Sequence, residues 1–187
     1  MSTAHGVETE VKIRLTDTAD AKLRLSGASF AISVPRRFES NTIYDTPDLT
    51  LRNSQMLLRL RQVGTESIVT WKGPYRAGPH KTRPELETSV GSLETFRQIL
   101  HALGYDPSFR YEKFRTEYQQ PSLPDGTVTL DETPIGDFFE LEGPADWIDR
   151  TAALLGFDRG AYVLESYVRL YVNDCAAKGV EPSNMIF

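Results

Sequence analysis

At 187 residues with 40% hydrophobic content, the chain can bury one proper core, so we expect a single domain (1–175) and a C-terminal tail (176–187). The formal net charge of −5 argues against a general nucleic-acid or membrane-surface binder, so any basic site must be local. The apolar runs are too short to span a bilayer, and Glu8 and Glu10 stand where a signal peptide would be apolar. Cys175 has no disulfide partner, which fits a cytoplasmic protein.

Short stretches of alternating polar and apolar residues, separated by glycine and proline turns, predict a series of strands. In chain order they cover about residues 7–15, 38–44, 56–63, 67–73, 82–90, 111–119, 126–132 and 137–143. Three helices with glycine stops are expected among them. These helices begin near Asp17 or Thr18, Ser92 and Pro144, and they end at Gly27, Gly104 and Gly156. A last segment around 163–173 has helical character, and the tail after Lys178 is expected to be loosely ordered.

Charged residues alternate with apolar ones along most of these strands. In the first strand Glu8, Glu10 and Lys12 share one face, whereas Val11 and Ile13 share the other. The later strands repeat the pattern at Arg59 with Arg61, Lys72, Arg83 with Glu85 and Glu87, Lys113 with Arg115, Asp131, and Glu140 with Glu142. A solvated outer face explains any single strand. Like charges side by side repel each other, however. Cations would relieve the repulsion between neighbouring carboxylates, and a bound polyanion would relieve the repulsion between neighbouring basic residues.

Two blocks of the sequence resemble each other. Glu85-Leu86-Glu87 leads into a helix that ends at Leu103-Gly104, and Glu140-Leu141-Glu142 leads into one that ends at Leu155-Gly156. Two such units, many short antiparallel strands and charges on one strand face together favour a barrel with a charged lumen. We therefore predict an α+β fold built on an eight-stranded antiparallel β-barrel with a few flanking helices.

Short motifs follow one another in a fixed order between about residues 7 and 170. They are Glu8-Thr9-Glu10-Val11-Lys12, Tyr44-Asp45-Thr46-Pro47, Leu58-Arg59-Leu60-Arg61, Trp71-Lys72-Gly73-Pro74, Arg83-Pro84-Glu85-Leu86-Glu87, Lys113-Phe114-Arg115, Leu130-Asp131-Glu132, Gly136-Asp137-Phe138-Phe139-Glu140-Leu141-Glu142 and Ser166-Tyr167. This series resembles the CYTH superfamily, the triphosphate tunnel metalloenzymes, which includes class IV adenylyl cyclases, thiamine triphosphatases and inorganic triphosphatases. The resemblance implies an eight-stranded tunnel whose acidic residues hold Mg²⁺ or Mn²⁺ and whose basic residues grip a triphosphate. A basic residue that some relatives carry near the C-terminus has no clear counterpart, with Arg169 and Lys178 as candidates.

The residue types then suggest roles within such a tunnel. Carboxylate oxygens suit Mg²⁺ or Mn²⁺, and the expected metal ligands are Glu8, Glu10, Asp131, Glu140 and Glu142. Basic side chains match phosphate oxygens, and the expected substrate-binding residues are Arg59, Arg61, Lys72, Arg83, Lys113 and Arg115. Lys12 and Glu85 are catalytic candidates, and Lys12 is left open between substrate binding and general-base work.

These roles predict a divalent-metal-dependent hydrolase that removes the terminal phosphate of an inorganic, nucleoside or thiamine triphosphate, as a monomer or a homodimer. A class IV adenylyl cyclase would use the same grip, so it remains the alternative. A non-catalytic module that binds a nucleotide or polyphosphate is the third hypothesis. The loop Gly73–Lys81, rich in glycine, proline and cations, is expected to be a mobile lid, because Arg76 and Lys81 could reach an anion at the tunnel mouth.

Overall fold

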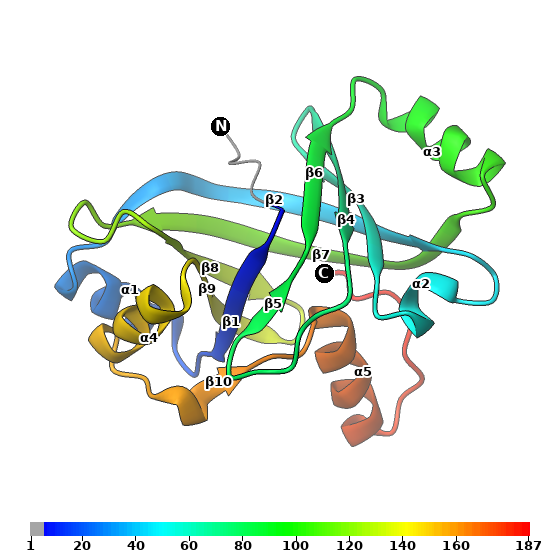
Figure 1. The fold of residues 1–187 in the computed structure, drawn as a ribbon. Coiled ribbons are helices and arrows are strands. Elements are labelled where there is room, and N and C mark those ends of the chain that lie inside the picture. Colours follow the sequence, from blue (N-terminus) through cyan, green and yellow to red (C-terminus); the bar gives the residue numbers. More distant parts are fainter. Residues whose placement is uncertain (1–5) are drawn as a thin grey trace.

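Strands dominate residues 6–187, the part of the chain that this computed structural model describes (Figure 1). In chain order the elements are β1 (Glu8–Arg14), α1 (Thr18–Gly27), β2 (Ala31–Asp45), α2 (Thr50–Asn53), β3 (Leu57–Val63), β4 (Glu66–Lys72), β5 (Lys81–Arg83), β6 (Glu85–Ser89), α3 (Leu93–Ala102), β7 (Asp106–Gln119), β8 (Thr127–Thr133), β9 (Gly136–Glu142), α4 (Ala145–Leu154), a 3-10 turn (Arg159–Ala161), β10 (Tyr162–Val163) and α5 (Tyr167–Lys178). None of the helices in this described part has the length and apolar character needed to cross a membrane.

The strands form an antiparallel barrel that is nearly closed (Figure 1). Around its wall, the order of hydrogen-bonded neighbours is β1, β9, β8, β7, β2, β3, β4 and β6. Strands β5 and β6 are separated only by Pro84 and together fill one place in the barrel wall. On one side of this place β6 pairs with β4, and on the other side β5 pairs with β1, which closes the barrel. Proline has no N–H to donate, so the ladder breaks where the chain changes its partner. This circuit confirms the predicted α+β fold with an antiparallel barrel of eight strand positions, to which the two-residue β10 is added beside β5 on the edge of β1.

The largest apolar core lies outside the barrel wall. Ile13 of β1 and Phe139 and Leu141 of β9 pack in one cluster with Trp147 and Ile148 of α4. Helices α1 and α4 lie together against this side of the barrel (Figure 1). Because side chains alternate between the two faces of a strand, burying these residues outside directs the polar residues between them into the lumen.

Strands β2 and β7 extend well beyond their predicted bounds. They pair from Ala31 opposite Gln119 to Asp45 opposite Asp106. Irregular register interrupts this pairing near Pro35. The irregular register, Pro35 and the adjacent arginines Arg36 and Arg37 break the period-two alternation there, which explains why the sequence pattern missed the first half of β2.

The predicted internal repeat corresponds to two similar strand–helix units. β6 leads into α3, and β9 leads into α4. Just after each helix stands a glycine with positive φ, Gly104 at 85° and Gly156 at 83°. This left-handed conformation stops a helix at little cost only for glycine, so the two units end by the same device.

The C-terminal segment packs on the barrel, although the sequence suggested a loosely ordered tail. Helix α5 continues to Lys178, so the expected boundary between residues 175 and 176 falls inside it. Beyond the helix, Met185 is fully buried and forms a short parallel bridge with Tyr111 of β7. These two residues share an apolar cluster with Phe138 and Tyr167, and this cluster anchors the segment.

Candidate functional site

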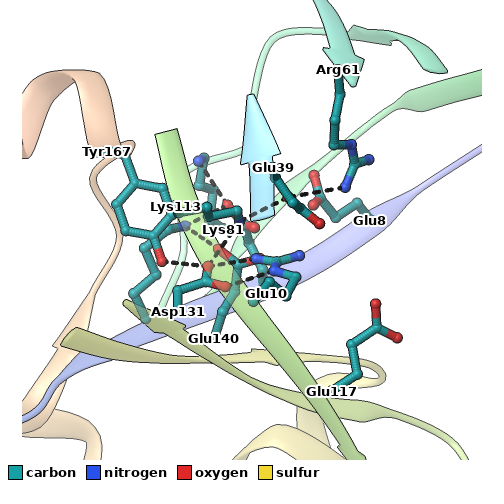
Figure 2. A network of polar contacts seen from close by, with 12 residues as sticks. Glu8, Glu10, Glu39, Arg61, Lys81, Lys113, Glu117, Asp131, Glu140 and Tyr167 are labelled. Carbon is teal, nitrogen blue, oxygen red and sulfur yellow. Dashed lines mark hydrogen bonds and ion pairs between the residues drawn. The ribbon is translucent and has the colours of Figure 1, made fainter. Parts of the chain in front are cut away.

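Charged side chains from every strand position of the barrel meet in the lumen, and ion pairs of 4 Å or less join them in one continuous network, part of which Figure 2 shows. Its central members are Glu8, Glu10, Lys12, Glu39, Arg59, Arg61, Lys72, Lys81, Arg83, Glu85, Glu87, Lys113, Arg115, Asp131 and Glu140. All of these except Glu85 and Glu87 are buried, and Arg37 extends the network from Glu39 to Glu117. The structure therefore brings together every predicted site residue except Glu142, which lies beside the network at its edge.

Asp131 is the most enclosed carboxylate of the site. Its oxygens accept hydrogen bonds from Lys113 (2.9 Å), from Arg115 (2.6 Å, twice) and from the Tyr167 hydroxyl (2.7 Å), as Figure 2 shows. A carboxylate offers about four lone-pair sites, so these bonds occupy its capacity. We therefore assign Asp131 to positioning Lys113 and Arg115 rather than to metal binding.

Lys12 lies between two carboxylates. Its ammonium group is 3.2 Å from Glu10 and 3.0 Å from Glu140. Burial alone would lower the pKa of Lys12, but Glu10 and Glu140 outweigh it and hold this pKa above its ordinary value. Of the two roles left open by the sequence, the structure favours a permanent positive charge that meets substrate over a neutral general base.

Arg59 and Arg61 project side by side from β3. Arg61 Nη2 is 2.7 Å from Glu87, and Arg59 donates to Thr70 (3.1 Å) and to the Tyr111 hydroxyl (3.3 Å). The buried Nε atoms of Arg59 and Arg61 have no hydrogen-bond partner among residues 6–187. Burial and then repulsion from Arg59 lower the pKa of Arg61, so its charge is incompletely compensated. The unused Nε donors of both arginines, and the incompletely compensated charge of Arg61, suit the oxygens of a phosphate group.

Acidic side chains crowd together near the start of β1. Glu8 lies 2.7 Å from Lys72 and 3.2 Å from Arg83, and the same Lys72 is 3.0 Å from Glu85. Burial, followed by the charge of Glu10, nevertheless raises the pKa of Glu8 to about 8. The carboxylates at this end are therefore only partly neutralised by the cations among them.

Of the five predicted metal ligands, Glu142 has the least compensation. It lies directly opposite Glu10 in the β1–β9 pairing, and its side chain forms no hydrogen bond or ion pair with the residues that the structure describes. Desolvation by the surrounding lumen residues, followed by the charge of Glu140, raises the pKa of Glu142 to about 7, although the residue as a whole is exposed at the edge of the network. A cation placed between these carboxylates would remove that repulsion.

The donor set can be compared with what a divalent cation requires. Within residues 6–187, no three acidic, histidine or cysteine side chains converge on a ready-made metal site. Mg²⁺, however, is commonly held by one or two carboxylates and completes its shell with water and substrate phosphates. Glu142, with Glu10 opposite it and Glu140 beside it, could supply one or two such carboxylates, and Glu8 adjoins Glu10.

Several lumen residues were missed by sequence reasoning. Lys81 lies 2.8 Å from Glu10, and the fully buried Glu39 lies 3.7 Å from Arg61. A signal existed for both, because Lys81 is two residues before Arg83 on a strand and Glu39 follows the same alternation in β2. Tyr167 lies in the last of the sequence motifs, but strand alternation gave it no place in the lumen, since it reaches Asp131 from helix α5 through tertiary packing.

A surface hollow of about 780 Å³ lies outside the barrel between α3 and the strands β2 and β7. Two of the charged pairs at its wall are internal: His101 lies 2.7 Å from Asp106, and Arg110 lies 2.6 Å from Glu112. The lumen gathers far more buried cations than this hollow, so the lumen is the candidate site.

Known proteins share this architecture. The model of the CYTH domain family matches residues 6–153. A Methanocaldococcus jannaschii protein, whose name suggests an adenylate cyclase, is 27% identical over 137 residues, or 73% of this chain and 76% of that protein. A Vibrio parahaemolyticus structure, also described as a suggested adenylate cyclase, has a TM-score of 0.76 at 20% identity and covers 87% of this chain and 96% of its own. A Hippeastrum structure described as having a dominant triphosphatase activity has a TM-score of 0.60 at 16% identity, covering 94% and 97%.

Proposed function

Because the chain belongs to the CYTH domain family, we propose that its lumen binds a triphosphate-containing small molecule and hydrolyses the terminal phosphate with Mg²⁺ or Mn²⁺. One observation carries this proposal: a single network gathers arginines and lysines from across the barrel wall and buries them against carboxylates. A triphosphate offers several oxygens at once, so it can take the place of carboxylates around these cations, and a divalent ion would compensate the displaced carboxylates. We place the activity in the cytoplasm, where Cys175 would stay reduced.

The cations divide into those that are fixed and those that remain available. Lys113 and Arg115 are held by Asp131, so they are pre-oriented for the phosphates. Arg59 and Arg61 keep unused Nε donors, and together with Lys72, Lys81 and Arg83 they would complete the grip. In phosphoryl transfer the protein contributes mainly positioning and charge stabilisation, which is what such a set provides.

The acidic residues would bind the metal ion and orient the attacking water. Glu10, Glu140 and Glu142, assisted by Glu8, would hold the divalent ion, which when bound neutralises charge between phosphate oxygens and acts as a Lewis acid. Burial opposes ionisation of Glu85, but the charge of Lys72, the hydrogen bonds with Glu8 and Lys72 and the charge of Arg59 together outweigh it and lower the pKa of this carboxyl. An ionised Glu85 is suited to orient an attacking water, which is the role that we propose for it.

A product assay separates this function from its alternatives. The purified protein is incubated with tripolyphosphate, ATP and thiamine triphosphate under Mg²⁺ and Mn²⁺, and again in excess chelator. We expect inorganic phosphate with a divalent ion and none in chelator. Full turnover in chelator would contradict the metal dependence, and binding without any product would favour a non-catalytic module.

An adenylyl cyclase is the second candidate, and the names of the Methanocaldococcus and Vibrio relatives favour it. It would use the same cations but join the ribose 3′-hydroxyl to the α-phosphate. Pyrophosphate together with cyclic AMP from ATP would identify this reaction in the same assay.

A further inference from the structure

One carboxylate outside the barrel ties together segments that are distant in the sequence. Asp149 of α4 accepts a hydrogen bond from the Tyr162 hydroxyl (2.9 Å) and from the guanidinium of Arg159, and its Oδ1 lies 2.9 Å from His80 Nε2. The hydrogen bond from Arg159, with those from His80 and Tyr162, holds the pKa of Asp149 well below its usual range. His80 is buried, although it comes from the loop expected to be exposed.

These contacts lie beside the seam where the barrel closes (Figure 1). One edge of β1 is shared by two short strands, because β5 pairs with Glu8–Glu10 and β10 pairs with Lys12 and Ile13. His80 directly precedes β5, and Tyr162 is the first residue of β10. Asp149 therefore holds the start of both strands on the same edge.

Strand β5 needs such an anchor. It has three residues, and two of them, Lys81 and Arg83, direct their cationic groups to the lumen carboxylates Glu10 and Glu8. So short a strand makes few ladder hydrogen bonds, and the loop before it contains two glycines and two prolines between Gly73 and Pro79. The position of β5 on β1 therefore depends on the contacts at the N-terminal end of β5.

We propose that His80 and Asp149 are positioning residues that fix Lys81 in the lumen for contact with the bound anion. The inference rests on the phosphate grip proposed above. Neither residue touches the lumen, so their effect on binding must pass through Lys81. A contact that served only stability would leave the affinity of the folded protein unchanged.

A double-mutant cycle tests this coupling. Tripolyphosphate is titrated calorimetrically, in chelator to prevent turnover, into the full-length wild type, His80→Leu, Lys81→Met and the double variant. Lys81→Met should weaken binding roughly 10- to 100-fold, the range of a charge-assisted hydrogen bond. His80→Leu should weaken it by about tenfold, within the range of measured coupling energies. The double variant should bind no more weakly than Lys81→Met, because the histidine acts through the lysine.

Two further variants keep the result interpretable. His80→Gln places an amide nitrogen near the position of Nε2 and should restore most of the affinity. Arg150→Ala breaks an exposed ion pair with Asp146 on the same helix and should change nothing. Thermal midpoints show whether each variant is folded. If Lys81→Met weakens binding but His80→Leu does not, or if the two effects multiply, the positioning role is overturned. If Lys81→Met itself leaves the affinity unchanged, the phosphate grip of Lys81 fails and the positioning role fails with it.

Discussion

Arg59 offers the simplest test of the lumen at the level of one residue. Arg59→Ala removes a buried donor, so triphosphate binding should weaken by roughly 1.5–3 kcal/mol, the range of a charge-assisted hydrogen bond. The thermal midpoint of the free protein should barely fall or even rise, because losing the contact with Thr70 also ends the repulsion of Arg61. Titration and thermal melting of this variant check both expectations. Unchanged affinity would remove β3 from the binding site.

Asn41 stands out among the buried polar residues of the wall. It is fully buried on β2 opposite Arg61, and neither polar atom of its side chain has a partner within residues 6–187. An unsatisfied buried group costs about 1–3 kcal/mol, so Asn41→Leu should stabilise the free protein while weakening triphosphate binding. Thr151→Val is the matched control, because its buried hydroxyl also lacks a described partner but lies on α4, outside the lumen. It should stabilise without changing affinity, and equal binding by wild type and Asn41→Leu would contradict the prediction.

Glu142 predicts how stability depends on pH. Its pKa rises from 4.5 to about 7 on folding, so the folded state holds the proton more tightly than the unfolded chain between these values. Stability in chelator should therefore fall as pH rises through this window, and Glu8, whose pKa is raised to about 8, adds loss in the same direction. Thermal midpoints from pH 5 to 8.5 measure the slope. Glu142→Gln should flatten it, whereas an unchanged slope would mean that Glu142 carries no such shift.

Single residues also show where sequence reasoning succeeds. Arg59 and Lys113 could be assigned to the lumen because strict alternation forces every second residue of a strand to one face. Lys81 was assigned to a mobile loop because the glycines and prolines before it dominate the local composition. Tyr167 belongs to the motif series, but its place in the lumen could not be predicted, since its contact with Asp131 depends on how α5 packs against the barrel.

Among the elements, the loop before β5 is less free than its composition suggested. His80 and Lys81 at its end are buried, and Arg76 donates its backbone N–H to the Thr82 carbonyl (2.8 Å). We therefore expect lid motion only in residues 74–79. Hydrogen exchange there should be fast without ligand and slower with a non-hydrolysable triphosphate, whereas residues 81–83 should be protected in both states. Exchange that the ligand does not alter in residues 74–79 would rule out a lid.

The strand pairing shows a second limit of sequence reasoning at this scale. One strand was expected over about residues 82–90, and the structure divides it at Pro84 into β5 and β6. Alternation continues across the proline, since Arg83 and Glu85 both reach the lumen, so the pattern gave no sign of the division. The change of partner from β4 to β1 follows from barrel closure, which is a property of the whole sheet.

At the scale of the whole molecule, stability and function occupy opposite faces of the same strands. The apolar faces pack outward against α1 and α4, and the charged faces enclose the lumen. Sequence alternation could predict this division, because it assigns residues to two faces. It could not say which charged groups would pair, since each pair joins strands that are distant in the chain.

This division predicts that activity and stability can be lost separately. Glu140→Gln should abolish most turnover by weakening metal binding, yet leave a folded protein, because Lys12 keeps Glu10 and Arg115 keeps Asp131 as partners. Ile148→Ala, in the outer core, should instead lower the free energy of unfolding by about 2–5 kcal/mol, the usual cost of such a cavity. At a temperature where it remains folded, Ile148→Ala should keep wild-type triphosphate affinity. Denaturant melts and metal-dependent kinetics on both variants measure the two losses separately. Wild-type turnover by Glu140→Gln across metal concentrations would remove Glu140 from the metal site.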